Sequence, residues 1–191
     1  MGLGPELDKI RQEIDACTSD AQRLAAGLTE EQLAWRPDPG RWSVAEIFVH
    51  LNLATQTYAP SIVRTIEEAR RKQLFGGGPF GFGFVGRLFI SSLEPPVRMK
   101  TRAPKLIRPL LQGPARDALP HFLRSQQIVL KLLEEANGLD LRRVTFVSPF
   151  SALLRTNLLA PFGIITAHQR RHLWQGWNVR KQLEMKSAQS A

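Results

Sequence analysis

The chain has 191 residues, of which 43% are hydrophobic and 23% are charged. This length and composition fit a single globular domain over residues 1–191 and exclude an intrinsically disordered chain. The net charge of +9 favours anionic partners. No nucleic-acid-binding motif accompanies that charge, so we expect no nucleic-acid function.

The cysteine count and the lack of long apolar runs bear on the cellular compartment. Cys17 is the only cysteine, so no intramolecular disulfide can form, which suits a reducing cytoplasm. It falls on the apolar stripe of the first predicted helix, and we interpret it as a core residue. No run reaches the roughly 18 apolar residues that a membrane-spanning helix needs. We expect a soluble cytoplasmic protein, with attachment to a membrane surface left open.

The first half of the chain predicts two long amphipathic helices. Apolar residues recur every three or four positions over 7–28, which predicts the first helix. A capping box at 29–32 starts one short helical turn. Ser43 then caps a second helix over about 44–72, in which Pro60 is expected to introduce a kink or an end.

The second half predicts two more helices. One covers about 115–136, and the other covers about 151–183 with interruptions expected at Pro161 and Gly163. Residues 139–149 are expected to be irregular. Four long helices with almost no alternating strand pattern predict an all-α four-helix bundle.

A long segment, 73–114, separates the second and third helices. Glycine alternates with phenylalanine near its start, and 85–93 fits one short helix. Basic residues outnumber the single acid, Glu94, between positions 87 and 108, and a solvated basic loop is one interpretation of them: Arg87, Arg98, Lys100, Arg102, Lys105 and Arg108. Connections of this length inside a compact domain are uncommon and are usually functional or disordered. We favour a lid or packing segment over a membrane anchor, and a dimer contact is a further interpretation.

The histidines carry the clearest chemical signal. His168 and His172 are four residues apart on one helical face, where two neutral imidazoles can share a zinc, nickel, iron or copper ion. The competing interpretation is that the two histidines are exposed on the surface and bind no metal. His50 can point inward from the second helix and complete a three-histidine site with an open position, as in catalytic zinc centres. His121 is expected on the surface, and Trp42 is expected only to pack.

Three further side chains are candidates for catalysis or ligand binding. Glu46 precedes His50 by one helical turn and could orient a metal-binding histidine or be an extra ligand, although we favour the interpretation that it only completes the helix cap. Gln175 faces the same way as His168 and could hydrogen-bond a ligand, or it could be an ordinary polar helix residue. Arg171 could bind a substrate carboxylate, or it could form a salt bridge.

Two segments of the chain resemble the DinB-like (YfiT-like) superfamily of metal-dependent enzymes. The first runs LTEEQLAWRP over 28–37, continues with WSVAE over 42–46 and ends at His50. The second is AHQRRHLWQ over 167–175. The resemblance implies a four-helix bundle in which His50, His168 and His172 bind a divalent metal. Zinc or nickel is expected first, and iron or manganese are alternatives.

The resemblance also implies classes of function. Several members of the superfamily are S-transferases that use a low-molecular-weight thiol, so we expect a small-molecule substrate, a transferase-like or hydrolase-like activity and a homodimer. The alternative is a non-catalytic metal-binding or structural bundle that binds a protein or a membrane surface through 73–114. An open metal position facing a pocket would favour the enzyme.

Overall fold

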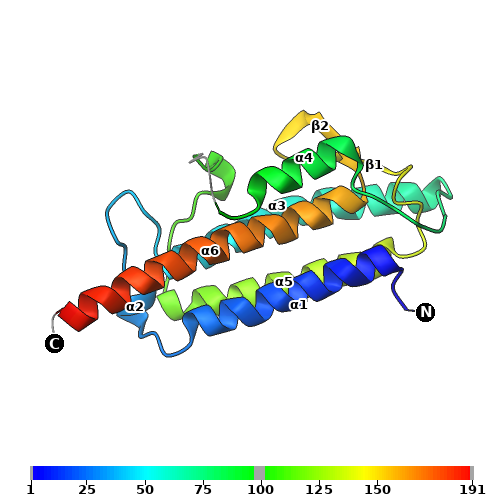
Figure 1. The fold of residues 1–191 in the computed structure, drawn as a ribbon. Helices are drawn as coiled ribbons and strands as arrows, with labels where there is room; N and C mark the ends of the chain where they lie inside the picture. Colours follow the sequence, from blue (N-terminus) through cyan, green and yellow to red (C-terminus); the bar gives the residue numbers. More distant parts are fainter. Residues whose placement is uncertain (1, 97–101, 190–191) are drawn as a thin grey trace.

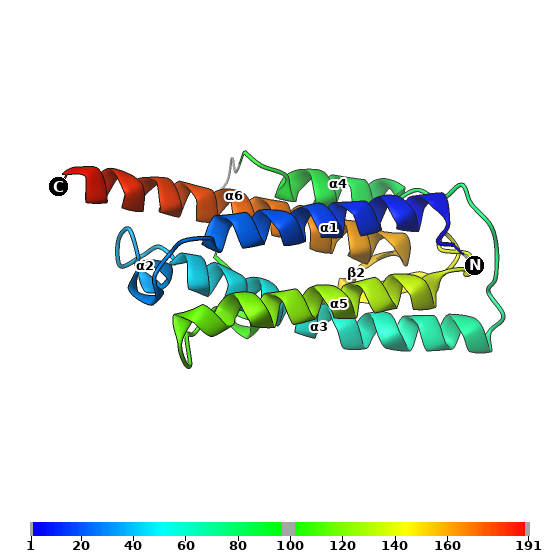
Figure 2. The ribbon, with the colours of Figure 1, turned by 90° about the horizontal axis from the view of Figure 1, so that it is seen from below.

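The computed structural model describes residues 2–96 and 102–189. Four long helices run along one axis (Figure 1). They are α1 (Pro5–Ala25), α3 (Val44–Arg71), α5 (Ala118–Ala136) and α6 (Leu159–Gln189). Each of α1 and α3 contacts both α5 and α6, and Figure 2 shows the four side by side. The fold is therefore mostly helical, as predicted.

The capping signals mark the helix starts correctly. Thr29 accepts the backbone N–H of Gln32 at the start of α2 (Glu30–Ala34), and Ser43 accepts that of Glu46 at the start of α3. Both reciprocal bonds of each capping box are present. Pro60 lies inside α3 and does not end it, because the buried stripe continues on both sides of the proline and holds the helix against its neighbours.

The expectation of a helix from residue 151 is wrong. Two strands, β1 (Thr145–Ser148) and β2 (Ser151–Asn157), form an antiparallel hairpin there, and α6 begins only at Leu159. The side chain of Asn157 accepts the backbone N–H of Ala160 at 3.1 Å, which marks the helix start. Pro161 then falls in the first turn of α6, where its missing N–H leaves no bond unmade, so it does not interrupt the helix.

The described parts of the segment 73–114 contain more secondary structure than the expected loop. It contains α4 (Gly83–Leu93) and a 3₁₀ turn, η1 (Lys105–Ile107), and a second 3₁₀ turn, η2 (Ala115–Asp117), precedes α5. Helix α4 packs on α6 and contacts β2. Of the basic residues between positions 87 and 108, Arg98 and Lys100 lie outside the described residues. Among the described helices, none has the length and apolar character needed to cross a membrane.

Candidate metal centre

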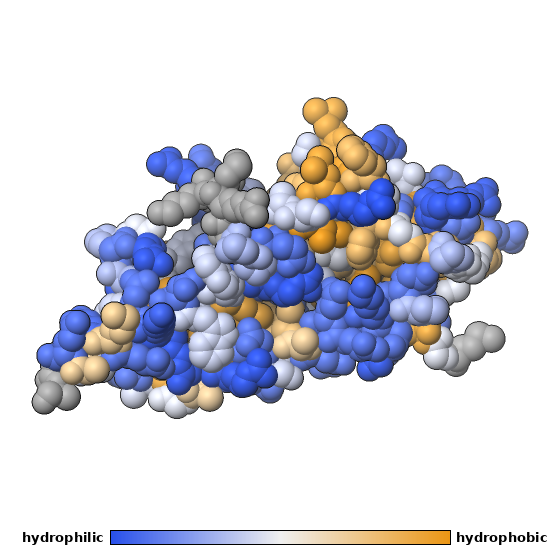
Figure 3. Space-filling view, in the orientation of Figure 1, coloured by the Kyte–Doolittle hydropathy of each residue, from blue (hydrophilic) through white to orange (hydrophobic). Residues whose placement is uncertain are grey.

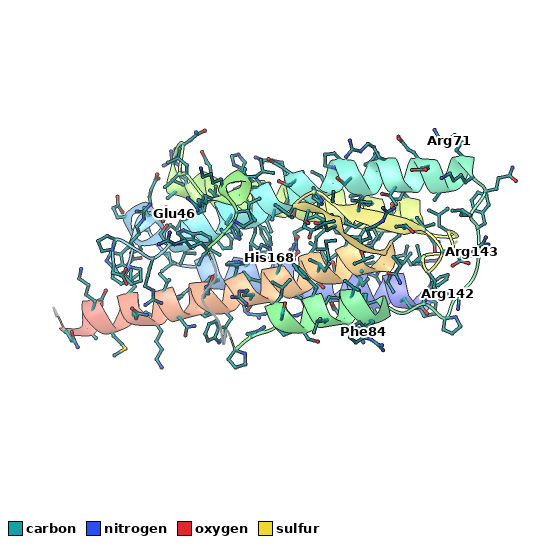
Figure 4. All side chains as sticks on the ribbon, turned by 90° about the horizontal axis from the view of Figure 1, so that it is seen from above. Glu46, Arg71, Phe84, Arg142, Arg143 and His168 are labelled. Carbon is teal, nitrogen blue, oxygen red and sulfur yellow. The ribbon has the colours of Figure 1, made fainter. Side chains whose placement is uncertain are left out.

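Three imidazole rings from two helices converge at one point. His50 lies on α3, while His168 and His172 lie one turn apart on α6. The Nε2 atom of His50 is 3.1 Å from Nε2 of His168 and 3.2 Å from Nε2 of His172. One ligand atom from each ring lies within 4.8 Å of the others. Figure 4 shows His168 on the side of α6 that faces the interior.

The orientation of His50 is fixed by a backbone carbonyl outside the two helices. Its Nδ1 atom lies 2.6 Å from the carbonyl oxygen of Ile107 in η1, which can only accept a hydrogen bond. Nδ1 therefore carries the proton, and Nε2 presents its lone pair to the other two rings. A hydrogen bond of this kind on the far nitrogen is the usual support of a metal-binding histidine.

The spacing of the three nitrogen atoms fits a shared ion. For a tetrahedral zinc ion with Zn–N bonds of 2.0–2.1 Å, two ligand nitrogens are separated by roughly 3.3–3.4 Å. The separations from His50 are 3.1 and 3.2 Å, which a small adjustment converts to that value. The single lone pair of His50 cannot accept a hydrogen bond from both partners, whereas one cation would satisfy all three rings. The donor set therefore fits a divalent transition metal.

The buried environment of the three rings disfavours their protonated forms. Burial lowers the pKa of His50, and the hydrogen bond to Ile107 opposes that shift only in part. Burial, aided by the neighbouring His50 and Arg171, lowers the pKa of His168 to about 3. Burial and the other two rings lower the pKa of His172 well below 6.5. Neutral imidazole is the protonation state that binds a metal.

The surroundings of the site differ between its two sides. The Trp42 ring lies 4.7 Å from that of His50 and 5.7 Å from that of His172, so it covers one side with an apolar surface. Among the described residues, the buried Nδ1 atom of His172 makes no hydrogen bond of ordinary geometry, although the Gln175 side chain lies near enough to favour protonation of that ring.

A cleft of about 1260 Å³ opens onto the three histidines. Its apolar wall includes Trp42, Phe89, Leu93, Phe150, Leu154 and Trp174. Its charged lining consists of four arginines and one carboxylate: Arg41, Arg102, Arg108, Arg171 and Asp38. A volume of this size accommodates a small molecule, and the positive excess favours an anionic one.

The catalytic candidates fall in different places. Arg171 is 8% exposed and lines the cleft, where one of its Nη atoms donates to the carbonyl oxygen of Ser92 at 3.3 Å. Gln175 lines the same cleft one turn later. The neighbouring Arg170 turns away and bridges Glu13 at 3.0 Å and Glu94 at 2.5 Å. The structure thus brings Arg171 and Gln175 together on the face of α6 that carries the two histidines.

The carboxylate of Glu46 accepts its hydrogen bonds from groups outside the histidine site. Its carboxylate accepts the backbone N–H of Ser43 at 2.9 Å and two hydrogen bonds from the guanidinium of Arg36, one of them 2.7 Å long. These contacts hold the short α2 segment to the start of α3. They support the interpretation of Glu46 as a capping residue, and Figure 4 shows it apart from His168 along the helix axis. His121 is exposed, as predicted.

Comparison of the sequence with known protein families identifies the family of this chain. The profile of the DinB superfamily matches residues 13–175, which include all three histidines of the site. Neither the curated proteins nor the solved structures contain a significant match to this chain. The match covers most of the chain and agrees with the helical fold and the placement of the histidines. The protein is a member of the DinB superfamily.

Proposed function

We propose that this protein is a divalent-metal-dependent enzyme acting on a small molecule, built on the four-helix bundle of its superfamily. The observation that carries the proposal is the convergence of three neutral imidazoles on one point beside a cleft. The superfamily is a metal-binding one, which supports the same assignment. The donor set favours zinc or nickel, with iron and manganese as alternatives.

His50, His168 and His172 would hold the ion, and all three also line the cleft. When bound, the ion supplies Lewis-acid chemistry, which favours the ionised form of a thiol or of water. The hydrogen bond from His50 to Ile107 keeps the ring in the required tautomer. Trp42 excludes water from one side of the site, which strengthens electrostatic interactions within it.

The cleft residues would bind and orient the substrate. Arg171 presents a guanidinium that can bind a carboxylate or phosphate in a bidentate manner. Gln175 lies one turn away and can donate to or accept from the same molecule. We propose these two residues as the substrate-positioning pair of a thiol S-transferase-like or hydrolase-like reaction. A structural metal would need a closed fourth position, and the adjoining cleft favours the enzyme over that alternative.

Metal analysis of protein purified without a polyhistidine tag tests the proposal. We expect one bound ion per chain in the wild type and loss of the ion in His168→Ala, His172→Ala and the variant with all three histidines changed. His121→Ala is the matched control, because it removes an exposed histidine elsewhere on the chain and should retain the ion. Stoichiometric metal in the triple variant, with its fold intact by circular dichroism, would disprove the assignment.

A second experiment separates the two reaction classes. The protein loaded with cobalt(II) should develop a sulfur-to-metal charge-transfer band in the near ultraviolet when cysteine is added, if a thiol is the nucleophile. Arg171→Gln and Gln175→Leu should keep the metal but raise KM for an anionic substrate. A cobalt spectrum that does not change with any thiol would favour the hydrolase.

A further inference from the structure

A ridge of exposed apolar side chains runs over α4 and β2. Three side chains dominate it: Phe84 is 75% exposed, Leu88 is 64% exposed and Leu153 is 94% exposed. Phe84 and Leu88 are four residues apart on one face of α4, and α4 contacts β2. Figure 3 shows this hydrophobic surface projecting from the molecule at the position of β2 and α4 in Figure 1. We call these three residues the α4–β2 ridge.

The ridge is the outer side of a wall whose inner side belongs to the cleft. Phe89 and Leu93 of α4 line the cleft, as do Ser151 and Leu154 of β2. The ridge residues are absent from that lining. The fold therefore already uses the inner faces of both elements, while the outer apolar face meets solvent. A contiguous apolar projection of this kind marks an interaction surface.

The charge around the ridge has one sign. Helix α4 and the hairpin over 145–157 contain Arg87 and Arg155, both exposed, and no acidic residue. Arg142 and Arg143 are exposed as well, and Figure 4 shows them beyond the end of α4 that carries Phe84. The ridge is therefore flanked by cations.

Three carboxylates, Glu94, Asp140 and Glu6, lie close to these elements in the chain or contact the segment just before α4, but they do not offset this charge on the ridge. Glu94 pairs with Arg170. Asp140 accepts the backbone N–H groups of residues 142 and 143, and Glu6 accepts the backbone N–H of Phe80. Each of these carboxylates is engaged at a position outside the ridge, so the ridge keeps its basic border.

We propose that the α4–β2 ridge docks the protein on the surface of an anionic phospholipid bilayer. Exposed phenylalanine and leucine side chains enter the interface between headgroups and acyl chains, and arginines beside them bind lipid phosphates. A second copy of this chain fits the surface less well. In a two-fold symmetric contact each ridge would meet another ridge bordered by arginines, with no carboxylate to oppose them.

Vesicle co-sedimentation tests the proposal with the metal-loaded protein. Vesicles of equal parts phosphatidylcholine and phosphatidylglycerol should bind the wild type, and vesicles of phosphatidylcholine alone should bind it far more weakly. Raising the sodium chloride concentration should weaken binding. Leu88→Ser and Leu153→Ser should each lower the partition coefficient about tenfold, because each removes one buried leucine from the bound state.

Matched controls distinguish lipid binding through the ridge from nonspecific hydrophobic or electrostatic adsorption. Leu110→Ser removes a leucine that is 68% exposed outside the ridge and should bind as the wild type does. Arg87→Gln with Arg155→Gln should weaken binding strongly, whereas Arg124→Gln with Lys131→Gln, which removes the same charge from α5, should not.

Several outcomes would overturn the proposal. These are no binding to the anionic vesicles at low salt, equal losses for Leu110→Ser and Leu153→Ser, or a solution dimer that Leu153→Ser dissociates. The last result would assign the ridge to self-association. The metal content of each variant is measured in parallel, so failure of lipid binding leaves the proposed metal centre untouched.

Discussion

Gln126 of α5 and Gln169 of α6 exchange two hydrogen bonds inside the core. The amide of Gln126 donates to Gln169 at 3.1 Å, and the amide of Gln169 donates back at 2.6 Å. Both side chains are at most 1% exposed. The pair satisfies its own polar groups where water cannot do so, and it fixes the rotation of α6 that aims the adjacent His168.

Removing one partner of this pair should leave a polar group of the other buried without its hydrogen bond. Gln169→Met strands the amide oxygen of Gln126 and should lower the free energy of unfolding by about 1–3 kcal/mol. The double variant with Gln126→Met removes both polar groups at similar volume and should lose less than the sum of the single losses. Urea denaturation of the four proteins measures the coupling. Additive losses would show that the two amides act independently.

Glu46→Ala should separate helix capping from metal binding. The change removes the partner of Arg36 and half of a capping box, so it should lower the free energy of unfolding by about 1–2 kcal/mol. The metal content should stay at that of the wild type, because the carboxylate is already engaged by the cap. Metal loss in a folded Glu46→Ala protein would make Glu46 a ligand.

Much of the fold could be predicted because its signals are local. Each capping box, one beginning at Thr29 and the other at Ser43, spans only four residues. Both boxes place the starts of α2 and α3 correctly. The hairpin was missed because SALLRTN over 151–157 has residues compatible with a helix. Its strand conformation depends on pairing with 145–148, and tertiary pairing of this kind overrides local propensity.

The candidate site was likewise predictable only where its signals are local in the sequence. The four-residue spacing of His168 and His172 predicts a shared face, and the structure confirms it. Ile107 could not be found, because a backbone carbonyl carries no sequence signal and it reaches His50 from 57 residues away. Trp42 was expected only to pack, but its ring also lies against two of the histidines.

Gly163→Ala should weaken the docking of α4 on α6. A Cβ atom at this position would lie 2.6 Å from the ring of Phe82 and 2.8 Å from Ile90. The steric cost of about 1–3 kcal/mol exceeds the gain of about 0.5–1 kcal/mol from replacing glycine within a helix. Thermal unfolding measures the net loss. The same change in a Phe82→Ala background should cost less, and an equal cost would place the strain elsewhere.

Cys17 should resist alkylation in the folded protein. Its side chain is 3% exposed, and burial raises the pKa of its thiol to about 12, so almost no thiolate is present at neutral pH. Iodoacetamide should label it slowly in native buffer and completely in guanidinium chloride, as measured by intact mass. Rapid labelling of the native protein would show that α1 opens readily or that Cys17 has a chemical role.

The metal-free protein should lose stability as the pH falls below neutrality. In the folded chain the pKa of His168 is lowered to about 3, and those of His50 and His172 are also lowered, whereas the unfolded chain has ordinary values near 6.5. Between these limits the unfolded state binds more protons, so the free energy of unfolding rises with pH. This stability is fully present above about pH 6.5 and declines toward pH 3. Urea midpoints are measured between these limits for the wild type stripped of metal and for the variant with all three histidines changed to alanine. The midpoint of the wild type should decline more steeply as the pH falls. Parallel declines would mean that the rings are protonated in the fold, which would contradict a site built for a cation.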